Sequence, residues 1–181
     1  MRDDFVKRRR NSMRDLTGRV ATGDLSAGEW LRKMRGQVKQ TFTANYAFGR
    51  GGTNAMTAAD RKKVGRMVRD NGAYLQRFAE ELAAGKLSAA QAQARAEMYA
   101  AASTTAHAQG QAAAWGITLP VQPGISTACK ANCQCGWEIE QDDDEIRAYW
   151  RLHSAESCET CLERADAYNP FRIAKAREEA A

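Results

Sequence analysis

The chain has few histidines and no long apolar stretch, and these absences exclude several classes of protein. No run approaches the roughly 20 apolar residues that a membrane span requires, so we expect no membrane partner. The first residues lack the apolar region of a secretory signal, which predicts a protein made and kept in a reducing cytosol. Only two histidines are present, and no Ser/His/Asp or Cys/His catalytic order stands out.

The glycine-rich stretch at residues 49–52 does not have the setting of a phosphate-binding loop. Such a loop follows a strand and continues into Lys and Ser or Thr, and neither condition is met here. The acidic run at residues 142–145 has ligands for a hard cation, but a run of this kind in a hairpin turn is usually solvated. We therefore expect that the protein is not an enzyme.

Positive charge is concentrated in the first part of the chain. Residues 1–70 contain 17 Lys and Arg against 7 Asp and Glu, a net charge of +10, and they include the run Lys7, Arg8, Arg9 and Arg10. Residues 71–181 contain 10 against 15, a net charge of −5. This asymmetry is typical of a segment with an acidic partner, either nucleic acid or an acidic protein surface. A solvated helix face explains the same pattern, and both interpretations remain open.

Residues 1–116 have the pattern of a helical assembly with a basic N-terminal helix. Apolar residues recur at helical spacing over about 3–20, 27–47, from Thr57 to about Leu82, and 89–115. Capping-box spacing joins Ser26 to Glu29, Thr57 to Asp60, and Ser88 to Gln91. The element Gly-x-Leu-Ser-Ala occurs at 23–27 and again at 85–89, each time between two helices. The sequence thus predicts two helical hairpins, the last helix Ala-rich and suited to close packing in a bundle or oligomer.

The character of the chain changes after Gly116. Residues 117–128 form a Pro/Gly linker that holds two of the three prolines. Residues 129–181 form an acidic, cysteine-rich module, with expected strands at Cys135–Glu140 and Ile146–Leu152 around a turn at 141–144. A short helix over 156–168 follows, and Asn169-Pro170 ends it. The predicted fold class is mostly α, with a small α+β zinc-binding module after the two hairpins.

The most specific feature of the module is its set of cysteines, which are Cys129, Cys133, Cys135, Cys158 and Cys161. Zinc sites take thiolates in two local groups separated by a hairpin or helix, and Cys158-x2-Cys161 at a helix start is one such group. The first three cysteines supply the other group, with one to spare, and His153 is an alternative ligand. Which four bind stays open.

Four thiolates leave no coordination position for water, so the expected zinc ion is structural and not catalytic. It would fix a segment with too few large apolar side chains to fold alone. Two alternatives are unliganded thiols and a redox pair at Cys158 and Cys161. A redox pair of this spacing normally follows a strand in a βαβ unit, which is not expected here.

Several short motifs of the second half occur in a characteristic order. They are Pro123-Gly124, Ser126-Thr127, Cys129, Asn132-Cys133-Gln134-Cys135, Tyr149-Trp150, Ala155-Glu156, Cys158-x2-Cys161 and Asn169-Pro170. This order resembles the C-terminal part of tailed-bacteriophage head proteins, the minor capsid or head morphogenesis proteins of the Mu-like type. Residues 132–135 match that family's Asn-Cys-Arg-Cys signature with one change. The family commonly carries a histidine and an Asp-x-Arg stretch shortly before the signature, and residues 123–130 have neither.

The resemblance implies a virion component near the portal vertex or the capsid interior, with no enzymatic role. Its expected partners are copies of itself and other virion proteins, with packaged DNA as a further partner of the N-terminal helix. The alternative is a cytosolic, zinc-containing regulator that binds nucleic acid. Residues 129–168 contain ten acidic residues against four Lys and Arg, so the module itself is poorly suited to bind the phosphate backbone of nucleic acid. That alternative therefore depends on the basic N-terminal helix.

Overall fold

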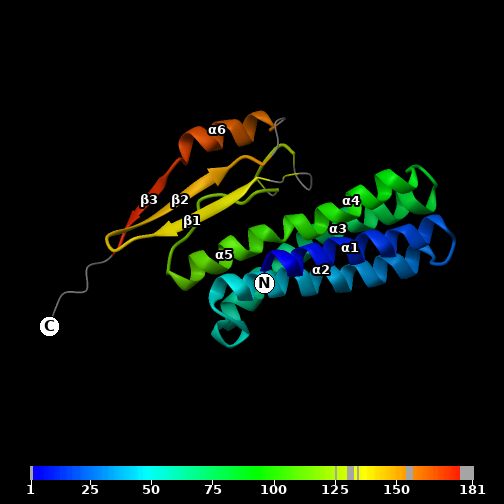
Figure 1. Ribbon diagram of the computed structural model, residues 1–181, viewed down its shortest axis with the longest axis horizontal. Helices are drawn as coiled ribbons and strands as arrows, with labels where there is room; N and C mark the ends of the chain where they lie inside the picture. Colours follow the sequence, from blue (N-terminus) through cyan, green and yellow to red (C-terminus); the bar gives the residue numbers. More distant parts are fainter. Residues whose placement is uncertain (1, 125, 130–132, 134, 154–156, 176–181) are drawn as a thin grey trace.

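The computed structural model describes residues 2–124, 126–129, 133, 135–153 and 157–175. The first part consists of α1 (Arg2–Ala21), α2 (Ala27–Arg50), a 3-10 turn at Thr53–Ala55, α3 (Ala58–Ala83), α4 (Ala89–Ala102) and α5 (Thr104–Ala114). The second part consists of β1 (Gly136–Gln141), β2 (Glu145–Arg151), α6 (Glu159–Ala167) and β3 (Phe171–Ala174). Figure 1 shows a long helical bundle, with the sheet and α6 set against the α5 end. None of the described helices is long and apolar enough to cross a membrane.

Three helices begin where the sequence predicts a capping box. The Ser26 hydroxyl accepts a hydrogen bond from the Glu29 backbone N–H, and the Glu29 carboxylate accepts one from the Ser26 N–H. The same reciprocal pairs start α3 at Thr57 and α4 at Ser88. Each pair satisfies backbone donors that the first helical turn leaves free. The three predicted capping boxes are confirmed.

The bundle is organised around α2, which packs against α1, α3 and α5. Its residues at four-residue spacing are almost completely buried: Trp30, Met34, Val38, Phe42 and Tyr46. The Trp30 indole also donates a hydrogen bond to the Thr17 hydroxyl of α1 at 2.9 Å. Helix α2 continues three residues past its expected end, and Gly51 caps it in the left-handed conformation with φ 95°.

Helices α2 and α5 touch through their backbones. A Cβ atom added to Gly110 would lie 2.2 Å from the Tyr46 carbonyl oxygen, and one added to Gly49 would lie 2.1 Å from that of His107. No side chain fits at either position, because real Cβ atoms do not approach other atoms so closely. The small residues expected to permit close packing therefore do so within this chain, between α2 and α5.

The single helix expected over 89–115 is wrong at its middle, where Ser103 separates α4 from α5. The Ser103 hydroxyl donates to the Ala100 carbonyl oxygen at 2.6 Å and accepts a hydrogen bond from the buried Asn45 amide at 2.7 Å. Thr104 donates to the Ala101 carbonyl oxygen in the same way. Hydroxyls that bond local carbonyls compete with the helical backbone, and here they accompany a break.

The predicted hairpin is confirmed, and a strand that the sequence analysis did not expect lies beside it. Strands β1 and β2 pair antiparallel with Trp137 opposite Trp150, and β3 pairs antiparallel with the other edge of β2. One face of the sheet is buried and contains Trp137, Ile139, Ile146, Ala148 and Trp150. The other face is charged, with Arg151 paired to Glu138 and Arg172 to Glu145.

The buried face of the sheet forms a second core together with α5 and α6. Ala108 and Ala112 of α5 belong to this core, as does Cys161 of α6. The segment expected as a Pro/Gly linker is also folded onto it, because Leu119 and Pro123 are buried and the Trp137 indole donates to the Val121 carbonyl oxygen at 2.9 Å. The module is thus fastened to the bundle through α5 and through residues 119–123.

Candidate metal centre

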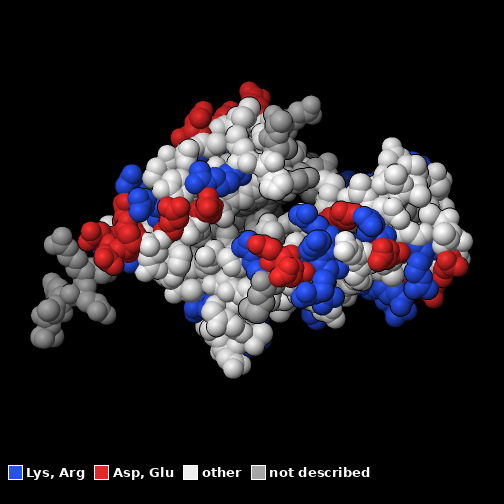
Figure 2. Space-filling view, in the orientation of Figure 1, with Lys and Arg blue, Asp and Glu red and all other residues white. Residues whose placement is uncertain are grey.

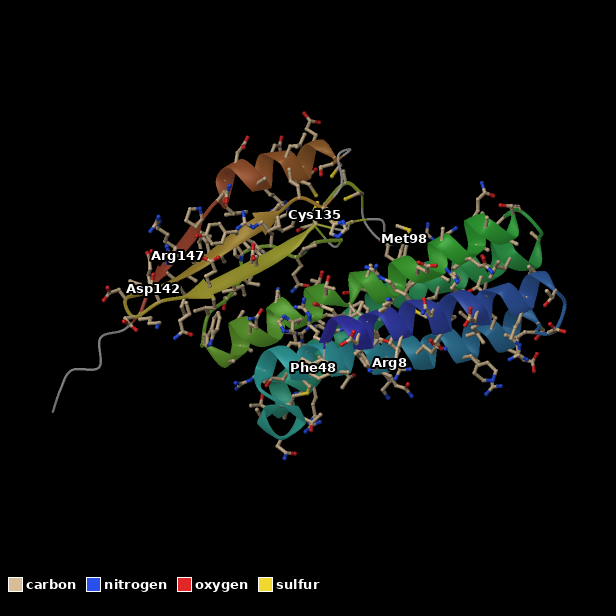
Figure 3. All side chains as sticks on the ribbon, viewed as in Figure 1. Arg8, Phe48, Met98, Cys135, Asp142 and Arg147 are labelled. Atoms are coloured by element: carbon tan, nitrogen blue, oxygen red, sulfur yellow. The ribbon has the colours of Figure 1, made fainter. Side chains whose placement is uncertain are left out.

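Three different segments bring the cysteines together at one end of the sheet. Cys129 follows the folded linker, and Cys133 and Cys135 directly precede β1. Cys158 occupies the N-cap position of α6, and Cys161 lies in the first turn of that helix. Figure 3 shows sulfur atoms gathered where β1 begins, near the labelled Cys135, beside the start of α6. The module therefore closes on these side chains.

Four of the five thiols form a chain of close contacts. The Cys158 and Cys129 sulfurs lie 3.5 Å apart, those of Cys129 and Cys161 lie 3.9 Å apart, and those of Cys161 and Cys133 lie 3.8 Å apart. The Sγ atoms of Cys129, Cys133 and Cys161 all lie within 4.8 Å of one another. These three thiols can hold a metal ion between them.

Three of the contacts between the thiols have about the length of an edge of a tetrahedral thiolate site. With metal–sulfur bonds of about 2.3 Å, the edge of a tetrahedron of sulfur atoms is about 3.8 Å. The three contacts in the chain, 3.5, 3.8 and 3.9 Å, are close to that edge. The cluster is also largely buried, with Cys133 7% exposed and Cys161 completely buried. A set of soft thiolates in this arrangement suits zinc or another thiophilic ion.

The two ends of the chain of thiols are the groups that ionise most readily. Burial raises the pKa of the Cys158 thiol, but the backbone N–H of Cys161 and the Cys129 thiol outweigh burial and lower this pKa to about 7. Burial likewise opposes ionisation of Cys133, yet hydrogen bonds with Thr127 and Cys129 leave its pKa below the ordinary value. The position of Cys158 at a helix N-terminus agrees with a stabilised thiolate.

The two central thiols retain their protons most strongly. Burial, followed by the neighbouring Cys158 and Cys133 thiols, raises the pKa of Cys129 to about 11, against the opposing hydrogen bond with Thr127. Burial and the surrounding sulfurs raise the pKa of Cys161 well above its ordinary range. Thiolates this close repel one another, so full ionisation of the cluster needs a cation at its centre.

Like Cys158, Cys135 does not belong to the three thiols that gather within 4.8 Å, although it forms a hydrogen bond with the Cys161 thiol. Its side chain is buried, and its sulfur lies 4.0 Å from the Ser157 hydroxyl. His153, the alternative ligand, is exposed and also lies outside that group. It lines a surface groove with Arg10, Arg14 and Met98 instead.

Thr127 supports the site, and the sequence analysis did not single it out for that role. Its buried hydroxyl accepts a hydrogen bond from the Gly124 backbone N–H at 3.1 Å and contacts the Cys129 sulfur at 3.5 Å. Arg164 of α6 donates to the Ser126 carbonyl oxygen at 3.0 Å, which ties the same loop to the helix of Cys161. The signal for this role in the sequence was a hydroxyl-bearing residue two positions before a cysteine of the cluster.

The basic run at the N-terminus is part of α1, and its Arg10 lines the same surface groove as His153. Lys7 and Arg8 are exposed, whereas Arg9 and Arg10 are half-buried, and the Arg9 guanidinium lies 5.2 Å from the Phe5 ring centroid. Figure 2 shows Lys and Arg over the bundle with acidic side chains between them, and acidic side chains at the β1–β2 turn and along α6. The run is thus built into the bundle and shares its surface with carboxylates.

In comparisons with known proteins, no protein-family model, curated protein or solved structure matches this chain.

Proposed function

We propose that the protein is a structural component of a tailed-bacteriophage head, in which a zinc ion held by cysteine thiolates fixes the C-terminal module. It acts through contacts with its own copies and with the portal or capsid, and it has no catalytic role. Its location is then the virion, assembled in the host cytoplasm. The observation that carries the metal part of the proposal is the chain of sulfur contacts, three of which have about the length of an edge of a tetrahedral thiolate site. The virion part is carried by the resemblance to phage head proteins.

The proposed zinc ligands are Cys129, Cys133, Cys158 and Cys161. Cys158 is proposed as the fourth ligand because its sulfur lies 3.5 Å from that of Cys129, and Cys135, which hydrogen-bonds the Cys161 thiol, is the alternative. Zinc bound there neutralises charges that the thiolates cannot carry together, and it leaves no open position for water or substrate. The chain's own contribution is to orient the thiols through the α6 N-terminus and the Thr127 hydroxyl.

A closed site of this kind stabilises a surface more than it performs chemistry. The module core rests on few large side chains, chiefly Trp137, Trp150 and Ile139, and a segment of this size folds more reliably with a metal. The resemblance of residues 123–170 to phage head proteins supplies the biological setting. The bundle supports the same role, because it is a long rigid element on which an assembly contact can be presented.

The test is association with particles. Cells would produce the chain together with the portal and capsid proteins of its phage, and density-purified heads would be quantified by mass spectrometry. The variant Cys161→Ser removes the thiol at the centre of the sulfur contacts, and Thr160→Ser on the same helix is the matched control. We expect wild type and control in the heads and at least a tenfold loss of the Cys161 variant.

The particle experiment also has a clear contrary result. A zinc-loaded, folded protein that stays entirely outside the heads would overturn the virion role and leave the metal centre intact. Equal incorporation of a folded, zinc-free Cys161 variant would instead show that the module's metal does not matter for assembly.

A further inference from the structure

The hairpin of α2 and α3 gathers six exposed cations that are dispersed in the sequence. They are Arg32, Arg35 and Lys39 on α2 and Lys62, Arg66 and Arg69 on α3. Within each helix the spacing is three or four residues, which places the side chains on one side of the helix. The Arg35 guanidinium donates to the Gln76 amide oxygen of α3 at 3.0 Å, and Tyr46 of α2 bonds Asp60 near the start of α3. The two helices are therefore antiparallel, and the two rows follow one another along the hairpin.

These cations have no ion-pair partners among the described residues. Among the residues that the structure describes, none of the six has a carboxylate at ion-pair distance. On α1, Arg2 pairs with Asp3 and Arg14 pairs with Glu97, whereas the run at residues 7–10 has no ion pair among the described residues either. Unpaired cations in two rows produce a positive field that favours an anionic partner.

Glycines accompany the cations and have no explanation within the chain. Gly36 of α2 and Gly72 of α3 lie inside helices, yet a Cβ atom at either position would meet nothing within 4 Å. At Gly65 the nearest atom is the tip of Arg69, 3.9 Å away. Glycine destabilises a helix interior relative to alanine. These positions therefore keep open space at a cost, which is expected where an outside backbone approaches closely.

Helical periodicity places two of the glycines in line with the cations. One line of residues along α3 has intervals of four, three and four, which places its members on one side of the helix: Gly65, Arg69, Gly72 and Gln76. The last of these, Gln76, accepts a hydrogen bond from Arg35 of α2. Gly65 and Gly72 thus lie along the seam where α3 meets α2, in line with Arg69. We call this surface, made of the six cations with Gly36, Gly65 and Gly72, the α2–α3 cationic face.

We propose that the α2–α3 cationic face binds the phosphate backbone of duplex DNA. Phosphate neutralisation by Lys and Arg supplies the affinity of such contacts, without any need for apolar anchors. A protein partner would instead require buried apolar or aromatic anchors at its centre. Among the described residues of α2 and α3, the exposed large apolar side chain is Phe48, and it makes an edge-to-face contact with Phe5 of α1.

Binding of a labelled 30-base-pair DNA duplex, followed by fluorescence anisotropy between 50 and 300 mM salt, tests the proposal. The triple variant Lys39→Gln, Arg66→Gln and Arg69→Gln removes three charges of the face. The control triple Lys7→Gln, Arg8→Gln and Arg19→Gln removes three charges of α1. We expect the first to weaken binding about tenfold or more at 100 mM salt and to reduce the salt slope by about 3, and the control to weaken it less than threefold.

The open space above the glycines is tested without any change of charge. Gly72→Gln fills the seam with a better helix former, so we expect an equal or higher melting temperature together with at least a threefold loss of duplex affinity. Ala94→Gln adds the same side chain on α4, and we expect no loss of affinity from it.

Equal losses in the two charge triples would overturn the proposal, because they would indicate non-specific attraction. Absence of duplex binding at 50 mM salt, or tighter binding of poly-glutamate than of DNA, would also overturn it, and the latter would indicate an acidic protein partner. The inference does not depend on the proposed virion role or on zinc, since the face lies on the bundle. Its failure would leave the particle experiment unaffected.

Discussion

The sulfur atoms of Cys129 and Cys158 lie 3.5 Å apart, although 29 residues separate them in the chain. The intervening residues include the β1–β2 hairpin, so this contact closes the module on itself. Cys161 then joins the closure to Cys133 at the start of the sheet. The thiol cluster therefore joins α6 to the sheet and to the end of the folded linker.

Removing the central thiol should release the metal and loosen the module. We expect Cys161→Ser to lose most bound zinc and to unfold with a free energy lower by about 3 kcal/mol at micromolar zinc. Cys135→Ser is the matched variant, and it should retain the zinc because its thiol lies outside the proposed ligand set. Zinc content and chemical unfolding of both variants measure this. Loss of zinc from Cys135→Ser with retention in Cys158→Ser would show that the fourth ligand is Cys135.

Zinc affinity should depend on pH with a slope that steepens in acid. Each thiol that is still protonated in the metal-free protein releases a proton on binding, so affinity falls as pH falls. The pKa of Cys158 is lowered to about 7, whereas that of Cys129 is raised to about 11. Cys129 therefore contributes to the slope throughout the neutral range, and Cys158 adds its own proton below pH 7. Competition with a chromophoric chelator between pH 5.5 and 8.5 measures the slope, and a constant affinity over that range would be contrary.

The backbone contact between α2 and α5 should tolerate no methyl group. Gly49→Ala and Gly110→Ala each drive a Cβ atom into a carbonyl oxygen, and overpacking of this kind destabilises by about 1–3 kcal/mol or more. Gly36→Ala in the same helix meets nothing within 4 Å and should stabilise by up to about 1 kcal/mol. Urea unfolding of the three variants provides the comparison. A neutral effect at Gly49 and Gly110 would mean that the two helices are farther apart.

The turn between α2 and α3 should lose stability in acid. The Tyr46 hydroxyl donates to the Asp60 carboxylate at 2.6 Å, and Arg50 and Thr57 bond the same group. Burial opposes ionisation of Asp60, but these hydrogen bonds outweigh it and lower the pKa to about 2. Because the folded pKa is depressed, the contribution is complete above the ordinary value of about 4 and is lost as pH falls toward 2.

The size of this effect is about 2 kcal/mol between pH 5 and pH 2, and Tyr46→Phe should reduce it. Unfolding free energies of wild type and Tyr46→Phe at these two pH values test the prediction, with Tyr74→Phe on the same bundle as control. An identical acid dependence in wild type and Tyr46→Phe would assign the low pKa to the other partners.

The helix starts were predictable because their signals are local. Ser26, Thr57 and Ser88 each satisfy backbone groups within four residues, so no distant contact is needed to recognise them. The break at Ser103 was not predictable in this way, because alanine favours an unbroken helix and the hydrogen bond from Asn45 joins residues 58 positions apart. Strand β3 was missed for a similar reason, since four residues become a strand through pairing with β2.

In the candidate site, too, the local pattern was predictable and the contacts between distant segments were not. Five cysteines in two groups predicted a metal centre, but spacing alone did not distinguish Cys135 from Cys129, because that choice depends on how the linker folds back. The six cations of the α2–α3 cationic face could not be recognised in the sequence as one group. No two of them are adjacent in the sequence, and only the pairing of α2 with α3 unites them.

The central claim is that one zinc ion in the thiol cluster holds the module together. Its most direct measurement is the metal content of the purified full chain by plasma mass spectrometry, with near-ultraviolet circular dichroism of the tryptophans before and after a chelator. We predict about one zinc per chain, and chelation should remove the signal of Trp137 and Trp150 while the helical bundle remains. A metal-free protein with the same fully ordered module would contradict the claim.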